Sequence, residues 1–198
     1  MQGLISILTP VFPVDEKRPA LFLDRDDTLI RDSPYLSKPE GVELLAGWRE
    51  GLSAFRKAGC RLIMVSNQSG VGRGLITTAQ LLAVHARLAE LLAEGGVQLD
   101  ATYYCPHEPQ AGCRCRKPGI GMLEAACRDF ATDLVGSLMV GDRTGDMEMG
   151  LAMGVQCAQF LNGQHGAVHP GVGFGVHSMS EAYENWLLWR RALAGGAE

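Results

Sequence analysis

Residues 21–30 read LFLDRDDTLI, and this stretch decides how the rest of the chain is interpreted. Its apolar start leads directly into Asp24, Asp26 and Asp27, which predicts a short buried strand of a parallel sheet that ends where the carboxylates begin. In open α/β sheets, ligands bind outside the carboxyl ends of the strands. Residues two apart in an extended segment point to the same side, so Asp24 and Asp26 would share one small volume at the mouth of a site.

Two carboxylates that close together repel each other unless one keeps its proton or a cation lies beside them. Hard oxygen ligands favour Mg²⁺. One carboxylate of such a pair can act as a nucleophile while the other transfers a proton. The alternative is an exposed turn of solvated aspartates, and this segment taken alone leaves both interpretations open.

Strands and helices alternate along the rest of the chain. Further strands are predicted within residues 60–67, 101–105, 137–142 and 155–160. Helices are predicted over residues 46–58, from 77 or 78 to the glycines at 95 and 96, and over 122–130, 144–154 and about 180–193. A glycine-rich turn is expected at residues 71–74, and a glycine-rich run at 162–175 leads to the last helix, whose Trp186 and Trp189 would pack on the flank of the domain. This alternation predicts a doubly wound α/β fold with a parallel sheet and no large cap domain. We expect residues 1–19 to be an N-terminal extension and residues 20–198 to form a single domain.

Composition limits the partners and the compartment. The 18 Lys and Arg against 22 Asp and Glu give a net charge of −4, which argues against nucleic acid or an anionic membrane as the main partner. No apolar run approaches the ~18 residues needed to span a bilayer, and the N-terminus lacks the features of a signal peptide. The six cysteines could suggest disulfides, but three lie near a histidine in a metal-like spacing. That favours a reducing cytoplasm, where we expect a monomer.

Reactive polar residues end three of the predicted strands, and a basic pair lies in a loop on the same edge. In chain order these are Asp24 and Asp26, Ser66 and Asn67, Arg116 and Lys117, and Asp142. Together they resemble the four motifs of the haloacid dehalogenase (HAD) superfamily of phosphatases. The resemblance covers about residues 20–160, with one departure: Asp27 replaces the glycine of the first motif.

The resemblance implies a role for each motif residue. Asp24 would attack phosphorus and form an aspartyl-phosphate, while Asp26 would protonate the leaving alkoxide and later activate water. Mg²⁺ would be held by the Asp24 carboxylate, the Asp26 backbone carbonyl and Asp142. Lys117 and the Ser66 hydroxyl would hold the phosphate oxygens.

Two further aspartates bear on this site. Asp146 lies one helical turn beyond Asp142 and would either orient the metal-binding residues or cap the start of a helix. Asp27 adds negative charge beside the nucleophile, which bears on the geometry of the turn and on the affinity for Mg²⁺.

A second motif, CPHEPQAGCRC, has the ligand set of a closed structural Zn²⁺ site. Its ligands would be Cys105, His107, Cys113 and Cys115. Such a site would stiffen a loop rich in glycine and proline and would position Arg116 and Lys117, which follow it directly. The alternative is a set of reduced thiols beside an unrelated histidine.

The zinc loop followed by CRKP is similar to a loop shared by heptose-bisphosphate phosphatases and histidinol-phosphate phosphatases. Residues 66–74, SNQSGVGRG, resemble the heptose branch, as does PGIGML after the RKP. The resemblance implies that a phosphorylated sugar contacts Asp32, Tyr35, Ser66, Asn67, Gln68, Ser69, Arg116, Lys117 and Arg143, the last of these standing where a lysine is usual.

The expected function is therefore a Mg²⁺-dependent phosphatase that removes the 7-phosphate of D-glycero-D-manno-heptose 1,7-bisphosphate, on the way to a nucleotide-activated heptose. Two alternatives remain open at this point. One is a histidinol-phosphate phosphatase, and the other is a zinc-stabilised binding module that has lost catalysis.

Overall fold

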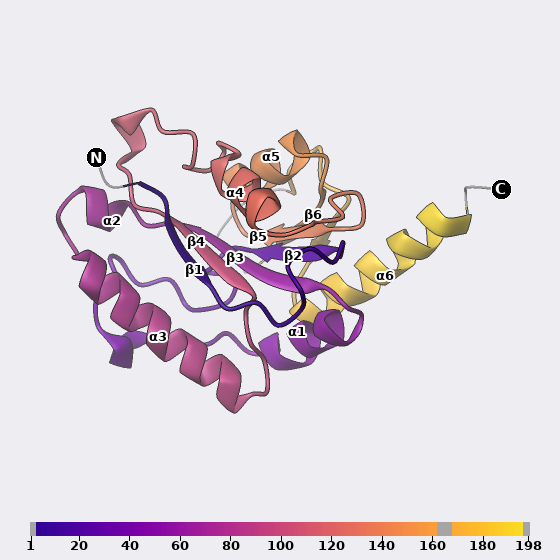
Figure 1. Ribbon diagram of the computed structural model, residues 1–198, viewed down its shortest axis with the longest axis horizontal. Coiled ribbons are helices and arrows are strands. Elements are labelled where there is room, and N and C mark those ends of the chain that lie inside the picture. The colour runs from indigo at the N-terminus through magenta and orange to yellow at the C-terminus, as the bar shows by residue number, and fades with distance from the viewer. Residues whose placement is uncertain (1–2, 162–167, 196–198) are drawn as a thin grey trace.

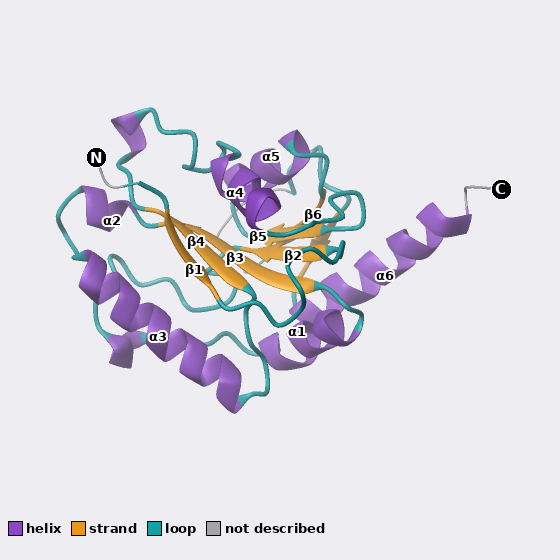
Figure 2. Ribbon diagram, viewed as in Figure 1, coloured by secondary structure: helices purple, strands orange, loops and turns teal. Residues whose placement is uncertain are grey.

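The strands form one mixed sheet at the centre of the molecule (Figures 1 and 2). Over residues 3–161 and 168–195, which the computed structural model describes, they are β1 (Ile5–Leu8), β2 (Ala20–Leu23), β3 (Arg61–Asn67), β4 (Ala101–Cys105), β5 (Leu138–Gly141), β6 (Gln156–Phe160) and β7 (Phe174–Val176). Their order across the sheet is β1-β4-β3-β2-β5-β6-β7. All neighbouring pairs are parallel except β1 and β4, so the predicted doubly wound α/β fold is confirmed.

Helices cover both faces of this sheet. They are α1 (Trp48–Lys57), α2 (Ser69–Gly72), α3 (Thr78–Glu94), α4 (Gly121–Asp129), α5 (Thr144–Ala152) and α6 (Met179–Gly195), with 3₁₀ turns at Pro39–Gly41 and Pro109–Ala111. Figure 1 shows α4 and α5 above the sheet, and α1, α3 and α6 below it. Among the described residues, no helix combines the length and the apolar character that a membrane crossing requires.

Alternate strand residues supply two separate hydrophobic cores, one on each face of the sheet. Leu21 and Leu23 of β2 pack in the core that includes Phe55 of α1. Phe22, between them, points to the opposite core, which includes Met122 of α4 and Met147 of α5. Strands buried on both faces read as continuous apolar runs, which is why residues 21–23 could be recognised as a parallel strand.

Helix α6 is held against α1 by aromatic packing. The ring centroids of Phe55 and Trp186 lie 5.2 Å apart, and Tyr183 meets Phe55 edge-on at the same distance. Trp186 is 3% exposed and its indole Nε1 donates to the Gly136 carbonyl at 3.0 Å. The prediction that Trp186 and Trp189 pack on the flank of the domain is confirmed, since Trp189 is partly buried against the same core.

The N-terminal segment differs from the expected extension because it takes part in the sheet. Residues Ile5–Leu8 form β1, which pairs with β4, and Thr9 continues the pairing by donating its N–H to the Asp100 carbonyl at 2.9 Å. Behind this strand, the buried Arg61 guanidinium donates to the backbone oxygens of Phe12, Pro13 and Glu16. A strand pairing and a buried arginine therefore attach most of residues 1–19 to the domain.

Two smaller differences concern short elements. The sequence predicted a glycine-rich turn at residues 71–74, whereas Ser69–Gly72 form the single-turn helix α2. Strand β7 begins at Phe174, near the end of the glycine-rich run at residues 162–175, where no strand was predicted. Residues 162–167 of that run lie outside the described residues. A three-residue strand containing a glycine carries too little periodicity to be recognised.

The strand order identifies where a ligand would bind. From β2 the chain moves to β3 and β4 on one side, whereas β5, β6 and β7 extend the sheet on the other. The boundary between β2 and β5 is thus the topological switch point, where α/β sheets open a crevice at the carboxyl ends of their strands.

Candidate active site

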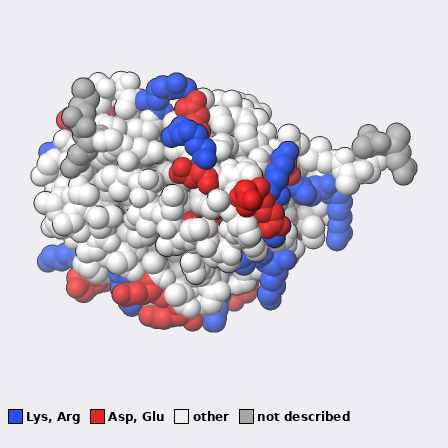
Figure 3. Space-filling model, viewed as in Figure 1, with Lys and Arg blue, Asp and Glu red and all other residues white. Residues whose placement is uncertain are grey.

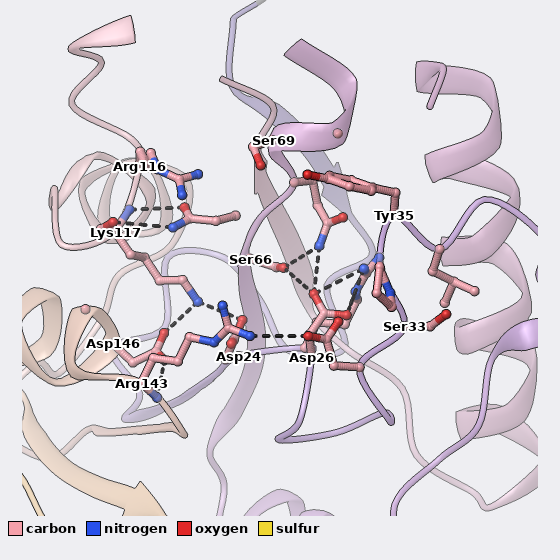
Figure 4. A pocket seen from close by; sticks show the side chains of 18 residues that line it. Asp24, Asp26, Ser33, Tyr35, Ser66, Ser69, Arg116, Lys117, Arg143 and Asp146 are labelled. Atoms are coloured by element: carbon pink, nitrogen blue, oxygen red, sulfur yellow. Dashed lines mark hydrogen bonds and ion pairs between the residues drawn. The ribbon is translucent and has the colours of Figure 1, made fainter. Parts of the chain in front are cut away.

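A cavity of about 490 Å³ opens at the carboxyl ends of β2 and β3, beside this switch point (Figure 4). It brings together every side chain that the sequence predicted to act in catalysis or to contact the substrate. They are Asp24, Asp26, Asp32, Tyr35, Ser66, Asn67, Gln68, Ser69, Arg116, Lys117 and Arg143. Asp142, the remaining predicted metal ligand of this site, is fully buried directly after β5.

One wall of the cavity is built around the Lys117 ammonium. Its Nζ lies 2.7 Å from Asp24 Oδ1 and 2.6 Å from Asp146 Oδ1, and it also donates to the Val65 carbonyl at 3.2 Å. The Lys117 side chain is 6% exposed. Buried charges persist only when they are paired, so these ion pairs hold the lysine over the end of β2.

Three carboxylates share the space beside this lysine. Asp24, Asp142 and Asp146 each offer an oxygen, and these oxygens all lie within 4.8 Å of one another. Oxygen ligands at this spacing are the donor set of Mg²⁺. Asp146, for which the sequence left two roles open, joins the cluster through its carboxylate and also accepts the Arg143 N–H at the start of α5 at 3.1 Å.

The electrostatics of the cluster favour a cation. Burial raises the pKa of Asp24 to about 7; Lys117 opposes this shift, whereas Asp146 and Asp26 add to it. Burial likewise raises the pKa of Asp146, against the effect of Lys117. Three buried carboxylates beside one ammonium leave excess negative charge, and a divalent ion among them would favour their ionised forms. The residues therefore fit a bound Mg²⁺.

The end of β5 is shaped to let Asp146 approach. A Cβ added at Gly141 would lie 2.4 Å from the Asp146 Cγ. Any larger residue at the end of this strand would push the carboxyl group of Asp146 away from the metal-binding cluster. The VGD sequence therefore supplies both a ligand, Asp142, and the space for its neighbour.

Asp26 faces away from this cluster. Arg25 holds it with Nε at 3.0 Å from Oδ1 and Nη2 at 3.1 Å from Oδ2, and Gln68 Nε2 donates to the same Oδ2 at 2.9 Å. The Ser66 hydroxyl lies 3.5 Å from Oδ2 and accepts from Gln68 at 2.8 Å. The Asp26 side chain is thus fixed as a separate group, outside the three carboxylates that lie together.

Sequence reasoning missed Arg25, because one of its contacts comes from a distant strand. Its side chain is 2% exposed, and its guanidinium lies 5.9 Å from the centre of the Tyr104 ring. A buried arginine needs a partner, and the adjacent carboxylate supplies it.

The loop after β4 brings the four predicted zinc ligands into mutual contact. The Sγ atoms of Cys105, Cys113 and Cys115 lie 3.3–3.6 Å apart, and His107 Nδ1 lies 3.5 Å from Cys105 Sγ and 3.2 Å from Cys115 Sγ. Ligands about 2.3 Å from a tetrahedral Zn²⁺ would lie about 3.8 Å apart. These thiols are free and too far apart to be disulfides, so the cluster fits a structural zinc ion.

Two hydrogen bonds between the Asn67 side chain and the Lys117 backbone attach the end of this loop to the cavity. Lys117 donates its N–H to Asn67 Oδ1 at 3.1 Å, and Asn67 Nδ2 donates to the Lys117 carbonyl at 3.3 Å. Asn67, predicted as a substrate contact, thus also joins the zinc loop to β3. Arg116 lies between this joint and the last zinc ligand and lines the cavity (Figure 4).

On the face shown in Figure 3, acidic and basic side chains are interspersed, and no large surface patch carries charge of a single sign. Charge is instead concentrated inside the cavity, where Arg116, Lys117 and Arg143 face the aspartates. Such an arrangement suits a small anionic ligand.

Comparisons with known proteins agree with this geometry. The family model described as HAD-hydrolase-like matches residues 114–170. The D-glycero-beta-D-manno-heptose-1,7-bisphosphate 7-phosphatase of Yersinia pestis is 37% identical over 177 residues, covering 86% of this chain and 89% of that protein. The protein of the same name from Escherichia coli (strain K12) is 39% identical over 144 residues, covering 69% and 75%.

A solved structure matches the fold closely. The D,D-heptose 1,7-bisphosphate phosphatase from B. bronchiseptica, crystallised with magnesium and phosphate, superposes with a TM-score of 0.78 at 30% sequence identity. The match covers 86% of this chain and 99% of that one.

Proposed function

The chain belongs to the D-glycero-D-manno-heptose-1,7-bisphosphate 7-phosphatase family of HAD-like hydrolases, and from this premise we propose that it removes the 7-phosphate of that heptose bisphosphate. The observation that carries the proposal is the buried group of Asp24, Asp142, Asp146 and Lys117 at the strand ends. A histidinol-phosphate phosphatase has no specific observation in its favour.

Asp24 is the nucleophile in the first step. Its carboxylate oxygen forms a bond to phosphorus while the bond from phosphorus to the sugar oxygen breaks, which gives an aspartyl-phosphate. Asp26 gives its proton to the departing sugar oxygen. Arg25 and Gln68 orient Asp26 for this transfer through the contacts described above.

A water molecule completes the cycle. Asp26, now ionised, takes a proton from the water, whose oxygen forms a bond to phosphorus as the bond to Asp24 breaks. Phosphate leaves and the two aspartates return to their initial states. Lys117 and the Ser66 hydroxyl stabilise the charge on the phosphate oxygens throughout.

Asp24 and Asp142 would hold Mg²⁺, together with the Asp26 backbone carbonyl that the sequence predicted, and Asp146 lies beside them. When bound, the ion supplies positive charge that offsets the repulsion between the carboxylates and the phosphate. Lys117 already provides one such charge, and its own pKa is raised by Asp146 and Asp24 although burial opposes the shift.

A bisphosphate fits the distribution of cations in the cavity. Lys117 is committed to the reacting end, whereas Arg116 carries a buried Nη1 without a hydrogen-bond partner among the described residues. A buried guanidinium nitrogen without an acceptor is costly, and a second phosphate would supply that acceptor bidentately. Arg143 adds a further positive group on the same cavity.

The other partners follow from the same chemistry. The thiol-rich loop would hold one structural Zn²⁺, and reduced thiolates suit a cytoplasmic enzyme. Residues 20–198, together with the N-terminal strand β1 that pairs with β4, would act as a single phosphatase domain. It would work as a monomer on a phosphorylated sugar.

The test is a turnover assay with Mg²⁺, comparing the heptose 1,7-bisphosphate with histidinol phosphate. We expect the bisphosphate to be preferred and to lose only its 7-phosphate, which can be followed by phosphorus NMR of the product. Preference for histidinol phosphate, or release of the 1-phosphate, would overturn the proposed substrate. No turnover of either would favour a binding module.

A further inference from the structure

Asp27 has no part in the mechanism or in the two metal-binding clusters. Its backbone φ is +53°, in the left-handed region, and the residue is 5% exposed. Glycine adopts this conformation without strain, and aspartate enters it more readily than most other residues. The backbone therefore accounts for a glycine at this position of the motif, but it does not account for a carboxylate.

The carboxylate closes a loop over the cavity. Asp27 Oδ1 accepts the backbone N–H of Asp32 at 3.1 Å, while the Asp27 N–H donates to the Ile30 carbonyl at 2.8 Å. A glycine could adopt the same φ but offers no side-chain acceptor. The bond to Asp32 therefore adds an attachment just after Arg31, whose N–H donates to the Glu43 carbonyl at 2.9 Å.

Asp32 is also the point where this loop meets the opposite wall. Its Oδ2 accepts from Arg143 Nη2 at 3.3 Å, with side chains 37% and 55% exposed. An ion pair this open to solvent is weak. The backbone bond from Asp27 is accordingly the firmer attachment of Asp32, and both charged groups remain available to a ligand.

The far end of the loop is held by different contacts. The Tyr35 hydroxyl accepts from Arg73 Nη1 at 3.1 Å, and a Cβ added at Gly70 would lie 2.8 Å from the Tyr35 ring. Asp32 and Tyr35 both line the cavity, and of their contacts described here only the one at Asp32 depends on the Asp27 side chain.

We propose that Asp27 is a positioning residue for substrate selection: its carboxylate holds Asp32 opposite Arg143, so that this pair contacts the sugar phosphate beside the carboxylate cluster. Arg143 Nε lies 3.6 Å from Asp142 Oδ2, which places the pair at the edge of that cluster. The hydroxyl groups of a sugar would donate to Asp32, and phosphate oxygens would engage Arg143. This inference rests on the proposed function, because it assigns a role in recognising the same class of substrate.

Two substitutions separate the possible roles of Asp27. Asp27→Gly keeps the left-handed backbone but removes the acceptor, whereas Asp27→Asn keeps an acceptor oxygen and removes the charge. Each would be assayed on the heptose bisphosphate and on p-nitrophenyl phosphate, a monophosphate that has no sugar hydroxyl group to donate to Asp32. Hydrogen exchange of the Asp32 amide would be measured in parallel, without substrate.

For Asp27→Gly we expect faster exchange at Asp32 and a rise of about tenfold in KM for the bisphosphate, the size typical of one lost hydrogen bond. Its kcat, and both constants for p-nitrophenyl phosphate, should change little. Asp27→Asn should restore slow exchange and a KM close to that of the wild type.

Three outcomes would overturn the proposal. Unchanged KM for the bisphosphate in Asp27→Gly would remove the role in selection, even if exchange at Asp32 becomes faster. An equal rise in KM in Asp27→Asn would show that the effect comes from the charge of Asp27 instead of from its hydrogen bond to the Asp32 amide. Equal losses on both substrates would place the effect at the reacting phosphate.

Failure of the proposed function would be recognised separately, because the wild type would then not turn over the heptose bisphosphate. The same comparison would be made with whichever phosphorylated substrate it prefers. The hydrogen-exchange measurement is informative in either case. If the Asp32 amide still exchanges slowly in Asp27→Gly, the Asp27 carboxylate does not hold Asp32 in place.

Discussion

The two predicted metal-binding clusters are built in opposite ways. The cysteine cluster runs from Cys105, the last residue of β4, to Cys115 in the loop that follows, and two of its four predicted ligands are only half-buried. The carboxylate cluster takes Asp24 from the end of β2 and Asp142 and Asp146 from the end of β5 and the start of α5, all of them buried. The first organises its own loop, whereas the second exists only when the sheet has formed. Damage to the first should therefore loosen one segment, and damage to the second should stop the chemistry.

The largest expected effect comes from the carboxylate cluster. Asp24→Asn cannot form the acyl phosphate, so turnover should fall on the order of 10²-fold or more. Zinc content and melting temperature should stay close to those of the wild type, because the cysteine loop is independent of Asp24. Activity above about a hundredth of the wild type in a steady-state assay would contradict the assignment of the nucleophile.

The cysteine cluster should give a different pattern. Cys113→Ser should lower the zinc content from one ion per chain, measured by metal analysis, and speed hydrogen exchange over residues 105–117. Turnover should fall by up to about 100-fold, because Arg116 and Lys117 lose their fixed positions.

Cys127→Ser is the matched control, because Cys127 is a free thiol outside the cluster. It should leave both zinc content and turnover unchanged. If wild-type protein freshly purified under reducing conditions is found to contain no zinc, the cysteine cluster does not hold the ion.

A smaller effect is expected where the two regions meet. Arg116→Ala should reduce kcat/KM for the bisphosphate by about 1–3 kcal/mol of transition-state binding, and p-nitrophenyl phosphate should be affected far less. Arg114→Ala is a suitable control from the same loop, since Arg114 is exposed and paired with Glu124 at 2.7 Å. Equal losses on both substrates would instead assign Arg116 to the reacting phosphate.

The smallest effect concerns protons at the carboxylate cluster. Because the pKa of Asp24 is raised to about 7 in the metal-free site, Mg²⁺ must displace a proton below that pH. The apparent Kd for Mg²⁺ should therefore fall as pH rises from about 6, by at most about tenfold per pH unit, and level off above about 7.

Calorimetric titration with Mg²⁺ across this pH range would measure that dependence. Asp24→Asn removes the titrating group and should give a flatter curve with weaker binding. A Kd that does not change with pH in the wild type would show that the Asp24 carboxyl group is already ionised before the metal binds.

The same contrast explains what the sequence could reveal. The four predicted zinc ligands could be recognised as one set because they all lie within residues 105–115, and Asp24 and Asp142 because each follows a strongly apolar run. Whether a residue follows the end of a strand can be read from the local sequence. The parallel arrangement of the strands then brings the carboxyl ends of separate strands to one edge of the sheet.

What the sequence could not reveal depends on contacts between distant segments. The antiparallel pairing of β1 with β4 joins residues about a hundred positions apart, and nothing in residues 5–8 specifies that partner. The Arg25 side chain pairs with Asp26 and lies beside the Tyr104 ring of β4, and no local pattern encodes this contact with a distant strand. Likewise, the bond between the Asp27 carboxylate and the Asp32 N–H depends on the geometry of the turn. The replacement of the motif's glycine by Asp27 does not reveal that geometry.

Strand β1 also has a consequence for the solubility of shortened forms of the protein. It covers the outer edge of β4, whose last residue, Cys105, is the first predicted zinc ligand. Removing residues 1–8 would leave the backbone N–H and C=O groups of β4 open along that edge, and an open edge invites pairing with another chain. A truncation chosen to remove an apparently dispensable leader would therefore expose an aggregation-prone strand next to the zinc loop.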